Sequence, residues 1–299
     1  MNIEEIKQDL ATKGYAVVPA VLAPEEVEEY MTDMRAWQDT IHDYEFIHKA
    51  VNPHGIHKFH YAGHTRAAWK IRLNINIRSI FAQLWGVDDV ENGLTVGFDG
   101  SCYIPPDCRL RDKVWTHSDQ SPLVDGLACY QAFATLTSNE SRTFVAYEGT
   151  HLLHKDYFES KGPVSASNWQ RCDPHDILGR FADRKRVLRV DAGDVVIWDS
   201  RTFHQNQYGP PPPPGESGEE RAVQYICYMP KSVRENSPAM QAKRLRYYAS
   251  RRTTSHWPYP IRVNSMQPQA FRDTRRRIDY DTLPVPYLRD LHHQIQSLL

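Results

Sequence analysis

The region from residue 94 to residue 229 constrains the fold most, because it holds a series of short β-rich runs separated by turn residues. The clearest runs cover residues 94–98, 127–136, 143–146, 187–190, 195–198 and 222–229. A turn at residues 191–194 separates two of them. Short strands at such spacing predict a mainly β fold, a sandwich or a barrel, with helices at its start and end.

The segments before this region alternate helical and extended patterns. Ile3, Ile6 and Leu10 recur at spacings of three and four, which predicts a short amphipathic helix. Residues 15–18 predict a strand, and Pro24 suits the first turn of a second helix. The apolar stripe of that second helix comprises Val27, Tyr30, Met31, Met34 and Trp37. Residues 78–85 predict a further helix, which Gly86 ends.

The chain length of 299 residues suits one domain with additions at both ends. We expect residues 1–93 to form an N-terminal helical and strand segment, residues 94–230 the β core, and residues 231–299 a basic C-terminal extension. Residues 208–220 include five consecutive prolines, so they cannot join a sheet and are expected to form an exposed loop.

Composition excludes several classes of protein. No run of 18 apolar residues occurs, and the first ten residues carry charges, so we expect a soluble, cytoplasmic protein without a membrane segment. The five cysteines are never spaced as Cys-x-x-Cys, which argues against a disulfide framework or a zinc ribbon. With 36 basic and 37 acidic residues, the chain gives no sign of a nucleic-acid partner, and the pattern sets no oligomeric state.

Two local concentrations of charge and histidine leave alternatives open. From Lys231 to the end there are thirteen Lys and Arg against five Asp and Glu, with runs at residues 251–252 and 275–277. This basic segment is either a solvated face or a contact for an anionic substrate. Residues 41–70 contain six histidines among Gly, Pro and Asn, which favours a loop over a metal site.

A histidine and an aspartate at positions i and i+2 are candidate metal ligands. On an extended backbone, His117 and Asp119 project from the same face, so one metal ion can bind both. The motif is weak alone, since the chain contains a second copy at His154 and Asp156. The choice between the copies therefore depends on the rest of the site.

His204 is a suitable third ligand, because it stands where the apolar run at residues 195–198 gives way to polar and aromatic residues. Two histidines and one carboxylate leave adjacent positions open on a metal ion, which suits a ferrous oxygenase that binds a chelating cosubstrate and dioxygen. The same three ligands could hold catalytic zinc.

Arg221 distinguishes these readings, because zinc chemistry needs no anchor for an oxoacid. Arg221 follows His204 by 17 residues and opens the run at residues 222–229. Its guanidinium can hold the distal carboxylate of 2-oxoglutarate by two parallel hydrogen bonds. The alternative is a surface arginine at the edge of a strand.

Three motifs follow one another along the chain. The first is the sequence from Gly14 to Pro19 followed by that from Leu22 to Val27. The second is Trp115-Thr116-His117-Ser118-Asp119-Gln120 followed by Glu148-Gly149-Thr150-His151, and the third is Gly193-Asp194-Val195-Val196 leading to His204 and Arg221. In this order they resemble the phytanoyl-CoA dioxygenase family of Fe(II)/2-oxoglutarate oxygenases, and the resemblance covers about residues 15–229.

The resemblance implies a double-stranded β-helix, that is, a cupin-like jelly roll. It also implies that His117, Asp119 and His204 bind Fe(II) and that Arg221 anchors 2-oxoglutarate, to which we add Thr135 and Asn206 as expected cosubstrate contacts. His154 and Asp156 then fall in a loop and helix outside the ligand set, and His151 is expected to be a structural hydrogen-bonding residue.

The implied reaction consumes O2 and 2-oxoglutarate, releases succinate and CO2, and hydroxylates a C–H bond of a small, polar or anionic substrate. Asp119 favours hydroxylation, because halogenating enzymes of this broad class have a small residue there. The interval from His204 to Arg221 is longer than the family pattern, which the proline-rich loop explains only if it loops out. The other functions considered are a zinc-dependent hydrolase or isomerase on a β-barrel and a non-catalytic jelly-roll binding module.

Overall fold

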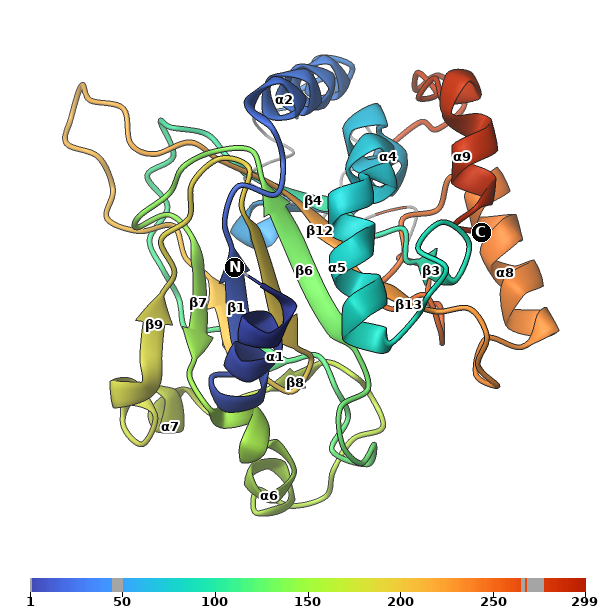
Figure 1. Ribbon diagram of the computed structural model, residues 1–299. Helices are drawn as coiled ribbons and strands as arrows, with labels where there is room; N and C mark the ends of the chain where they lie inside the picture. Colours follow the sequence, from blue (N-terminus) through green and yellow to red (C-terminus); the bar gives the residue numbers. More distant parts are fainter. Residues whose placement is uncertain (1, 45–50, 265–266, 268–276) are drawn as a thin grey trace. The chain divides into compact units, whose positions relative to one another are not determined.

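The computed structural model describes residues 2–44, 51–264, 267 and 277–299 (Figure 1). The chain divides into two compact units, of which unit 1 comprises Met1–Ala20 and Pro105–Arg221 and unit 2 comprises Val21–Ile104 and Ala222–Leu299. Both contain antiparallel sheet and helices, so the expected mainly β architecture with flanking helices is confirmed. The expectation of one domain over residues 1–299 stays a prediction.

One sheet of unit 1 is formed by β1 (Tyr15–Val18), β10 (Val195–Asp199) and β6 (Tyr130–Thr135), with β10 between the other two. Both pairings are antiparallel, and Trp198 lies opposite Tyr15 on one side and Gln131 on the other. Every residue of β10 is buried, which explains why this strand reads as a continuous apolar run in the sequence.

A second sheet of unit 1 has the strand order β8, β5, β11, β7, β9. Its strands are short: β8 is Gln170–Arg171, β5 is His117–Ser118, β11 is His204–Asn206, β7 is Phe144–Tyr147 and β9 is Lys185–Val187. All four pairings are antiparallel. Two of the expected metal ligands, His117 and His204, therefore belong to neighbouring strands.

Short helices surround these strands in unit 1. The first helix, α1 (Ile3–Thr12), begins with a capping box between Asn2 and Glu5 and packs on β1 and β10. The others are α6 (His154–Glu159) and α7 (Pro174–Leu178), together with the 3-10 turns η3 (Thr150–Leu152) and η4 (Ala182–Arg184).

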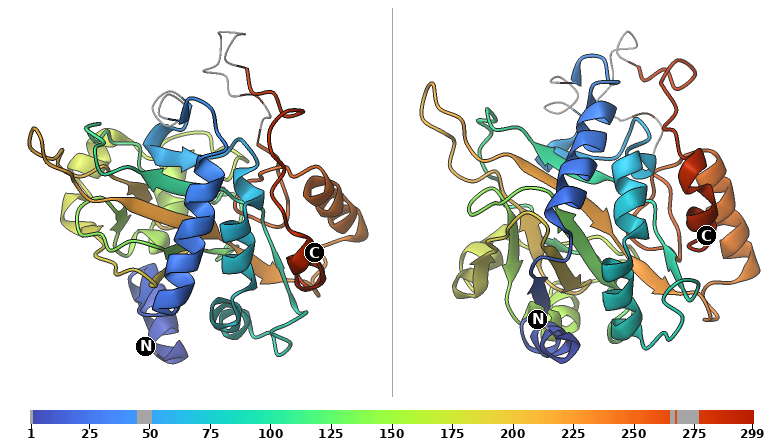
Figure 2. Two further views of the ribbon diagram at one scale, coloured as in Figure 1. Left: turned by 90° about the horizontal axis from the view of Figure 1, so that it is seen from above. Right: turned by 45° about the horizontal axis from the view of Figure 1, so that its top comes forward.

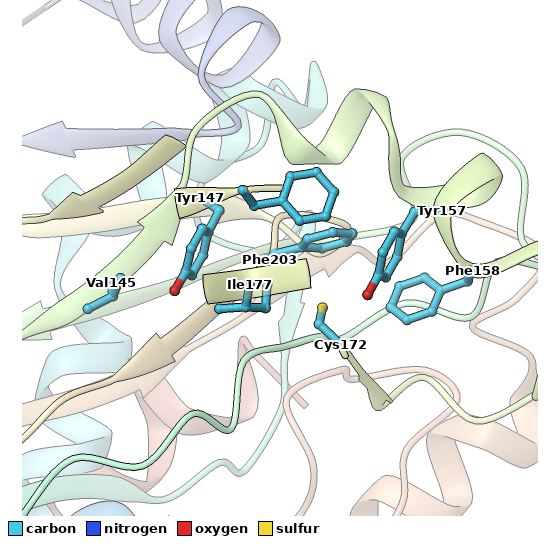
Figure 3. Packing of buried hydrophobic residues seen from close by; sticks show 8 residues of the cluster. Val145, Tyr147, Tyr157, Phe158, Cys172, Ile177 and Phe203 are labelled. Carbon is cyan, nitrogen blue, oxygen red and sulfur yellow. The ribbon is translucent and has the colours of Figure 1, made fainter. Parts of the chain in front are cut away.

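An aromatic cluster packs α6 and α7 against the second sheet (Figure 3). Phe203 stands at its centre, with its ring 5.0 Å from that of Tyr157 and 5.5 Å from that of Phe181. The labelled members are Val145, Tyr147, Tyr157, Phe158, Cys172, Ile177 and Phe203. Because Phe203 immediately precedes His204, burial of this cluster fixes the backbone that presents a candidate ligand.

The helices described for unit 2 are α2 (Pro24–Gln38), α4 (Arg66–Leu73), α5 (Ile75–Trp85), α8 (Pro238–Ala249) and α9 (His292–Gln296). Asn74 ends α4 and caps α5 with its side chain, and Gly86 ends α5 in the left-handed conformation. The views of Figures 1 and 2 show α8 and α9 side by side, where Arg244 donates hydrogen bonds to the carbonyl oxygen of Leu299. Three 3-10 turns, η1 (Pro53–Gly55), η2 (Ala62–His64) and η6 (Arg289–Leu291), complete the helical content described for this unit.

The strands of unit 2 are β12 (Arg221–Ile226), which begins at the last residue of unit 1, followed in sheet order by β4 (Ser101–Ile104) and β2 (Ile56–His57). A separate pair joins β13 (Tyr228–Pro230) to β3 (Leu94–Val96). The predicted run at residues 222–229 is thus two strands, because the chain changes pairing partner at Cys227.

The run predicted at residues 187–190 is displaced in the structure. The strand β9 ends at Val187, and Val190 forms only an isolated bridge with Asn139. The prediction from valine content placed this strand too late in the chain. The ladder between β9 and its partner β7 ends where Val187 lies opposite Val145. The interval 208–220 contains no strand and forms the expected loop (Figure 1), held at its base by a hydrogen bond of 2.8 Å from the Gly218 amide to the Pro106 carbonyl.

The histidines of residues 41–70 form no metal cluster in the part of the chain that the structure describes, which excludes His48. Burial lowers the pKa of His60 to about 4 and that of His64 to about 3, so both are neutral core residues. The five cysteines are all buried, and none of them forms a disulfide with another. Residues 275–276 of the basic run lie outside the described residues, and none of the described helices is both long and apolar enough to cross a membrane.

Candidate metal centre

The strand β5 presents the first two candidate ligands. His117 lies on the strand and Asp119 follows directly after its end, where the Asp119 amide donates a hydrogen bond of 2.9 Å to the carbonyl of Ser200. An extended backbone places side chains i and i+2 on one face, so both ligands point to the same side. Both side chains are buried, with exposed fractions of 6% and 7%.

His204 joins these residues through the sheet. It begins β11 and is the direct antiparallel partner of His117, so the two imidazoles lie on the same face of neighbouring strands. Their ring centroids are 4.4 Å apart. Sheet register therefore brings together two histidines that are 87 positions apart in the sequence (204 − 117).

The three side chains converge on one point. The Nε2 atom of His204 is 3.3 Å from one carboxylate oxygen of Asp119, and the Nε2 atom of His117 is 3.7 Å from the other. One potential ligand atom from each residue lies within 4.8 Å of the others, and this is the only such cluster of His, Cys, Asp and Glu among the described residues.

The other ring nitrogen of each histidine contacts the backbone. The Nδ1 atom of His117 is 3.2 Å from the carbonyl oxygen of Trp115, and the Nδ1 atom of His204 is 2.9 Å from that of Thr202. A carbonyl oxygen accepts only from a protonated Nδ1, so these contacts favour the tautomer in which Nε2 carries the lone pair that can bind a metal. The donor set fits a divalent transition metal, because it combines two neutral imidazoles with one carboxylate.

His154 and Asp156 do not join this cluster. They lie on helix α6, where residues two apart point in nearly opposite directions, so His154 is buried and Asp156 is exposed. The Nε2 atom of His154 is 3.0 Å from the Ser118 hydroxyl and 2.9 Å from the Gln120 carbonyl. His154 thus contacts the residues on either side of Asp119. Burial lowers the pKa of His154 to about 4.

The turn after β7 fixes the start of β11. Thr150 donates its hydroxyl hydrogen to the Tyr147 carbonyl at 2.6 Å and accepts a hydrogen bond from the Phe203 amide at 2.9 Å. The Nε2 atom of His151 is 3.1 Å from the carbonyl oxygen of Ala11, at the end of α1. His151 is therefore a structural hydrogen-bonding residue in this unit.

Arg221 is completely buried in unit 1. Its Nη2 donates to the Asn206 side-chain oxygen at 3.2 Å, its Nη1 lies 3.5 Å from the Thr143 hydroxyl, and the guanidinium stands 5.1 Å from the Phe133 ring centroid. Its Nε has no hydrogen-bond partner, and no acidic side chain pairs with Arg221 within the described ranges. A buried cation without a counterion is costly, so this guanidinium is suited to bind an anion.

Two other arginines of unit 1 show what a satisfied guanidinium looks like. Arg142 donates to the carbonyl oxygens of Pro105, Cys108, Tyr208 and Glu219, so its hydrogen-bonding capacity is used by the backbone. Arg201, the other arginine near His204 in the sequence, binds both carboxylate oxygens of Asp199, and this hydrogen bonding raises the pKa of Arg201. Arg221 alone of the three is left to bind a ligand.

The remaining expected contacts are Asn206 and Thr135, whose roles toward the cosubstrate stay predictions. Asn206 contacts Arg221 directly, whereas Thr135 donates its hydroxyl hydrogen to the Thr137 carbonyl at 2.7 Å. Thr143 was missed by the sequence reasoning, although it begins a predicted strand and its hydroxyl faces the Arg221 guanidinium. No sequence pattern indicated that His154 contacts Ser118.

The chain is similar to known proteins both in sequence and in fold. The chain is similar to the Ava biosynthesis cluster protein O of Aspergillus versicolor, with 25% identity over 250 residues, 75% of this chain and 77% of that protein. Among solved structures, it is similar in fold to the non-haem α-ketoglutarate-dependent carbocyclase SnoK from nogalamycin biosynthesis, with a TM-score of 0.54, 18% identity and coverage of 77% and 86% of the two chains.

A second structure of similar fold is GIG2, the product of GlcNAc Inducible Gene 2, from Candida albicans. The TM-score is 0.57 at 11% identity, and the match covers 82% of this chain and 67% of that one. No family model matches the sequence. The similarity to the phytanoyl-CoA dioxygenase family therefore stays a resemblance.

Proposed function

We propose that this chain is a non-haem Fe(II)- and 2-oxoglutarate-dependent oxygenase, with His117, Asp119 and His204 as iron ligands and Arg221 as anchor of the cosubstrate. One observation carries the proposal: a buried cluster of two histidines and one carboxylate lies in the same unit as a buried guanidinium without an acidic partner among the described residues. Such a ligand set leaves open positions for a chelating oxoacid and dioxygen.

The spacing of the two parts supports one cosubstrate that bridges them. His204 and Asn206 are two residues apart on one face of β11, and Asn206 contacts Arg221. Two residues of a strand span about 6.6 Å, so the metal ligand and the contact to the guanidinium are separated by roughly that distance. 2-Oxoglutarate carries a chelating oxoacid at one end and a carboxylate at the other, which suits this separation.

We further propose that the two sheets belong to a double-stranded β-helix of the phytanoyl-CoA dioxygenase type. The ligands on adjacent antiparallel strands β5 and β11, and Arg221 at the first residue of β12, support this topology. The long interval from His204 to Arg221 is compatible with it, because residues 208–220 leave the strands as a loop.

Bound iron would supply the oxidative chemistry, which couples conversion of 2-oxoglutarate and O2 into succinate and CO2 to hydroxylation of a substrate C–H bond. The residues of the chain prepare the site for it. The carbonyls of Trp115 and Thr202 hold the two imidazoles in the required tautomer, and Asp119 supplies the only negative charge among the three ligands. Burial of all three side chains keeps bulk water from the ligand atoms.

The proposed substrate is a small molecule. The similarity to a protein of a biosynthesis cluster and to a carbocyclase of nogalamycin biosynthesis supports this class over a protein or nucleic-acid substrate. The zinc-dependent hydrolase and the non-catalytic binding module remain the competing functions, and they predict different results in the same experiment.

Anaerobic titration of the apoprotein with Fe(II) and then with 2-oxoglutarate tests the proposal. We expect one iron per chain and a visible charge-transfer absorption that appears only when both are present. Exposure to air should then yield succinate. Preferential retention of zinc with no binding of 2-oxoglutarate would indicate the hydrolase, and failure to bind either metal would indicate a binding module.

A further inference from the structure

Gln131 is buried in unit 1 without a hydrogen bond. Its exposed fraction is 1%, and neither its amide nitrogen nor its amide oxygen has a partner among the described residues. Trp198, which is equally buried, has an indole Nε1 that also lacks a partner within the described ranges. Buried polar groups are nearly always hydrogen-bonded, so two such orphans together indicate a polar ligand or water that completes them.

Strand register places both orphans on the face of the metal cluster. Gln131 and Trp198 are direct partners between β6 and β10, so their side chains project to the same face, and Phe133 shares that face two residues further along β6. The Trp198 ring is 5.4 Å from the ring of His204, and the Phe133 ring is 5.1 Å from the guanidinium of Arg221.

The order along β6 runs from the metal ligands toward the guanidinium. At the start of β6, the Cys129 carbonyl accepts from the Ser200 amide at 3.0 Å, and the Ser200 carbonyl accepts from the Asp119 backbone amide at 2.9 Å. Beyond the end of β6, Asn139 donates to the carbonyl oxygen of Glu220, the neighbour of Arg221, at 2.8 Å. Gln131 therefore lies toward the metal-cluster end of β6, about 6.6 Å along the strand from Phe133, which contacts the guanidinium.

We propose that the Gln131 carboxamide and the Trp198 indole N–H donate hydrogen bonds to the metal-proximal half of bound 2-oxoglutarate, which comprises the 1-carboxylate and the 2-oxo group. This inference rests on the proposed function. The indole N–H is only a donor, and the amide of Gln131 can donate, so the pair suits the acceptor oxygens of an oxoacid. Arg221 binds the distal carboxylate, so the two ends of one ligand are recognised by separate groups.

Comparison of two ligands separates these roles. Succinate keeps the distal carboxylate that Arg221 would bind but lacks the 2-oxoacid group. In the Fe(II) protein without oxygen, Gln131→Met and Trp198→Phe should each weaken 2-oxoglutarate binding by about tenfold, as expected for loss of one hydrogen bond to a charged group. Binding of succinate, measured by competition, should stay within about twofold of the wild type.

Thermal unfolding of the ligand-free protein provides a second readout. Because Gln131 makes no hydrogen bond in the described structure, its replacement by methionine of similar shape should leave the midpoint unchanged or raise it. Gln205→Met is the matched control, because the side-chain oxygen of Gln205 accepts hydrogen bonds from the Trp115 backbone amide at 3.1 Å and the Thr116 hydroxyl at 2.7 Å. That control should lower the midpoint and leave the ratio of the two ligand affinities unchanged.

The outcomes are distinct. If the wild type, Gln131→Met and Trp198→Phe all bind 2-oxoglutarate equally well, these two residues have no role in its binding. The proposed function would still stand. Equal losses for 2-oxoglutarate and succinate, or a lowered unfolding midpoint in Gln131→Met, would assign Gln131 a structural role and overturn the inference. Absence of 2-oxoglutarate binding to the iron-loaded wild type would refute the proposed function, and this role with it.

Discussion

Replacement of Arg221 by lysine tests the proposed cosubstrate anchor most directly. Lysine keeps the positive charge but replaces the planar, forked guanidinium with a single ammonium group, so it cannot make two parallel hydrogen bonds to one carboxylate. The site offers little compensation, because Arg221 is fully buried and its protein contacts are the oxygens of Asn206 and Thr143 at 3.2 and 3.5 Å.

The magnitude follows from the lost hydrogen bond. A hydrogen bond to a charged group contributes about 1.5–3 kcal/mol, which corresponds to about a tenfold to hundredfold loss of 2-oxoglutarate affinity. Iron affinity should stay near that of the wild type, because Arg221 is not a member of the ligand cluster. Succinate should lose affinity together with 2-oxoglutarate, since both carry the distal carboxylate.

The assay is anaerobic titration of 2-oxoglutarate into the Fe(II) protein, with Arg201→Lys as matched control. Arg201 is bound to both oxygens of Asp199, so its replacement should change 2-oxoglutarate affinity by less than about twofold. Unchanged affinity in Arg221→Lys would remove Arg221 from the site. A loss in Arg201→Lys alone would make Arg201 the anchor and contradict the reasoning from buried, unpaired charge.

Three further predictions concern the ligands and the buried histidines. His117→Ala should abolish Fe(II) binding, whereas His154→Ala should still bind Fe(II). The His154→Ala protein should lose about 1–3 kcal/mol of unfolding free energy, because the substitution removes the partner of Ser118 and Gln120. Metal titration and urea unfolding of both variants check this prediction, and an equal loss of iron binding in both would contradict it. Asp119→Ala should stop succinate formation, since it removes one of three ligands and the only ligand charge; succinate produced at the wild-type rate would exclude Asp119 from the site. Burial lowers the pKa of His60 to about 4, whereas the unfolded chain takes up that proton near pH 6.5, so His60 alone should lower the unfolding free energy by about 1–2 kcal/mol between pH 6.5 and 5. His64 and His154, whose pKa values are also lowered, add to the fall. His60→Asn, which tolerates the positive φ of 57° at this position, should reduce the total decline by about the share of His60 in urea titrations, and an unchanged slope would be the contrary result.

Sequence patterns predicted those elements whose own residues determine their conformation. The capped helix Ile3–Thr12, the helix that begins at Pro24 and the buried strand Val195–Asp199 carry their periodicity in one continuous stretch. The strands of two and three residues that present His117 and His204 were not predicted, because so few residues carry no periodicity and exist only through their pairing partners.

The candidate site divides in the same way. Residue types and their order along the chain indicated His117, Asp119, His204 and Arg221, because two imidazoles and a carboxylate can bind a metal and a guanidinium can bind a carboxylate. The sequence could not exclude the second His-x-Asp pair by itself. The helical conformation of α6 does so, since it points His154 and Asp156 in different directions.

The sequence by itself therefore determined which side chains have the chemistry for a metal and an oxoacid. Only the tertiary structure decided which of them converge and which polar groups are left without partners. Arg201 and Arg221 are the same residue type near His204 in the sequence. Arg201 pairs with Asp199, whereas Arg221 is buried without an acidic partner among the described residues. Nothing in the sequence distinguishes Gln131 from other strand residues. The structure shows that its amide nitrogen and oxygen are buried without a hydrogen-bond partner among the described residues. Burial and hydrogen-bond pairing depend on distant strands, and a single segment of sequence does not contain that information.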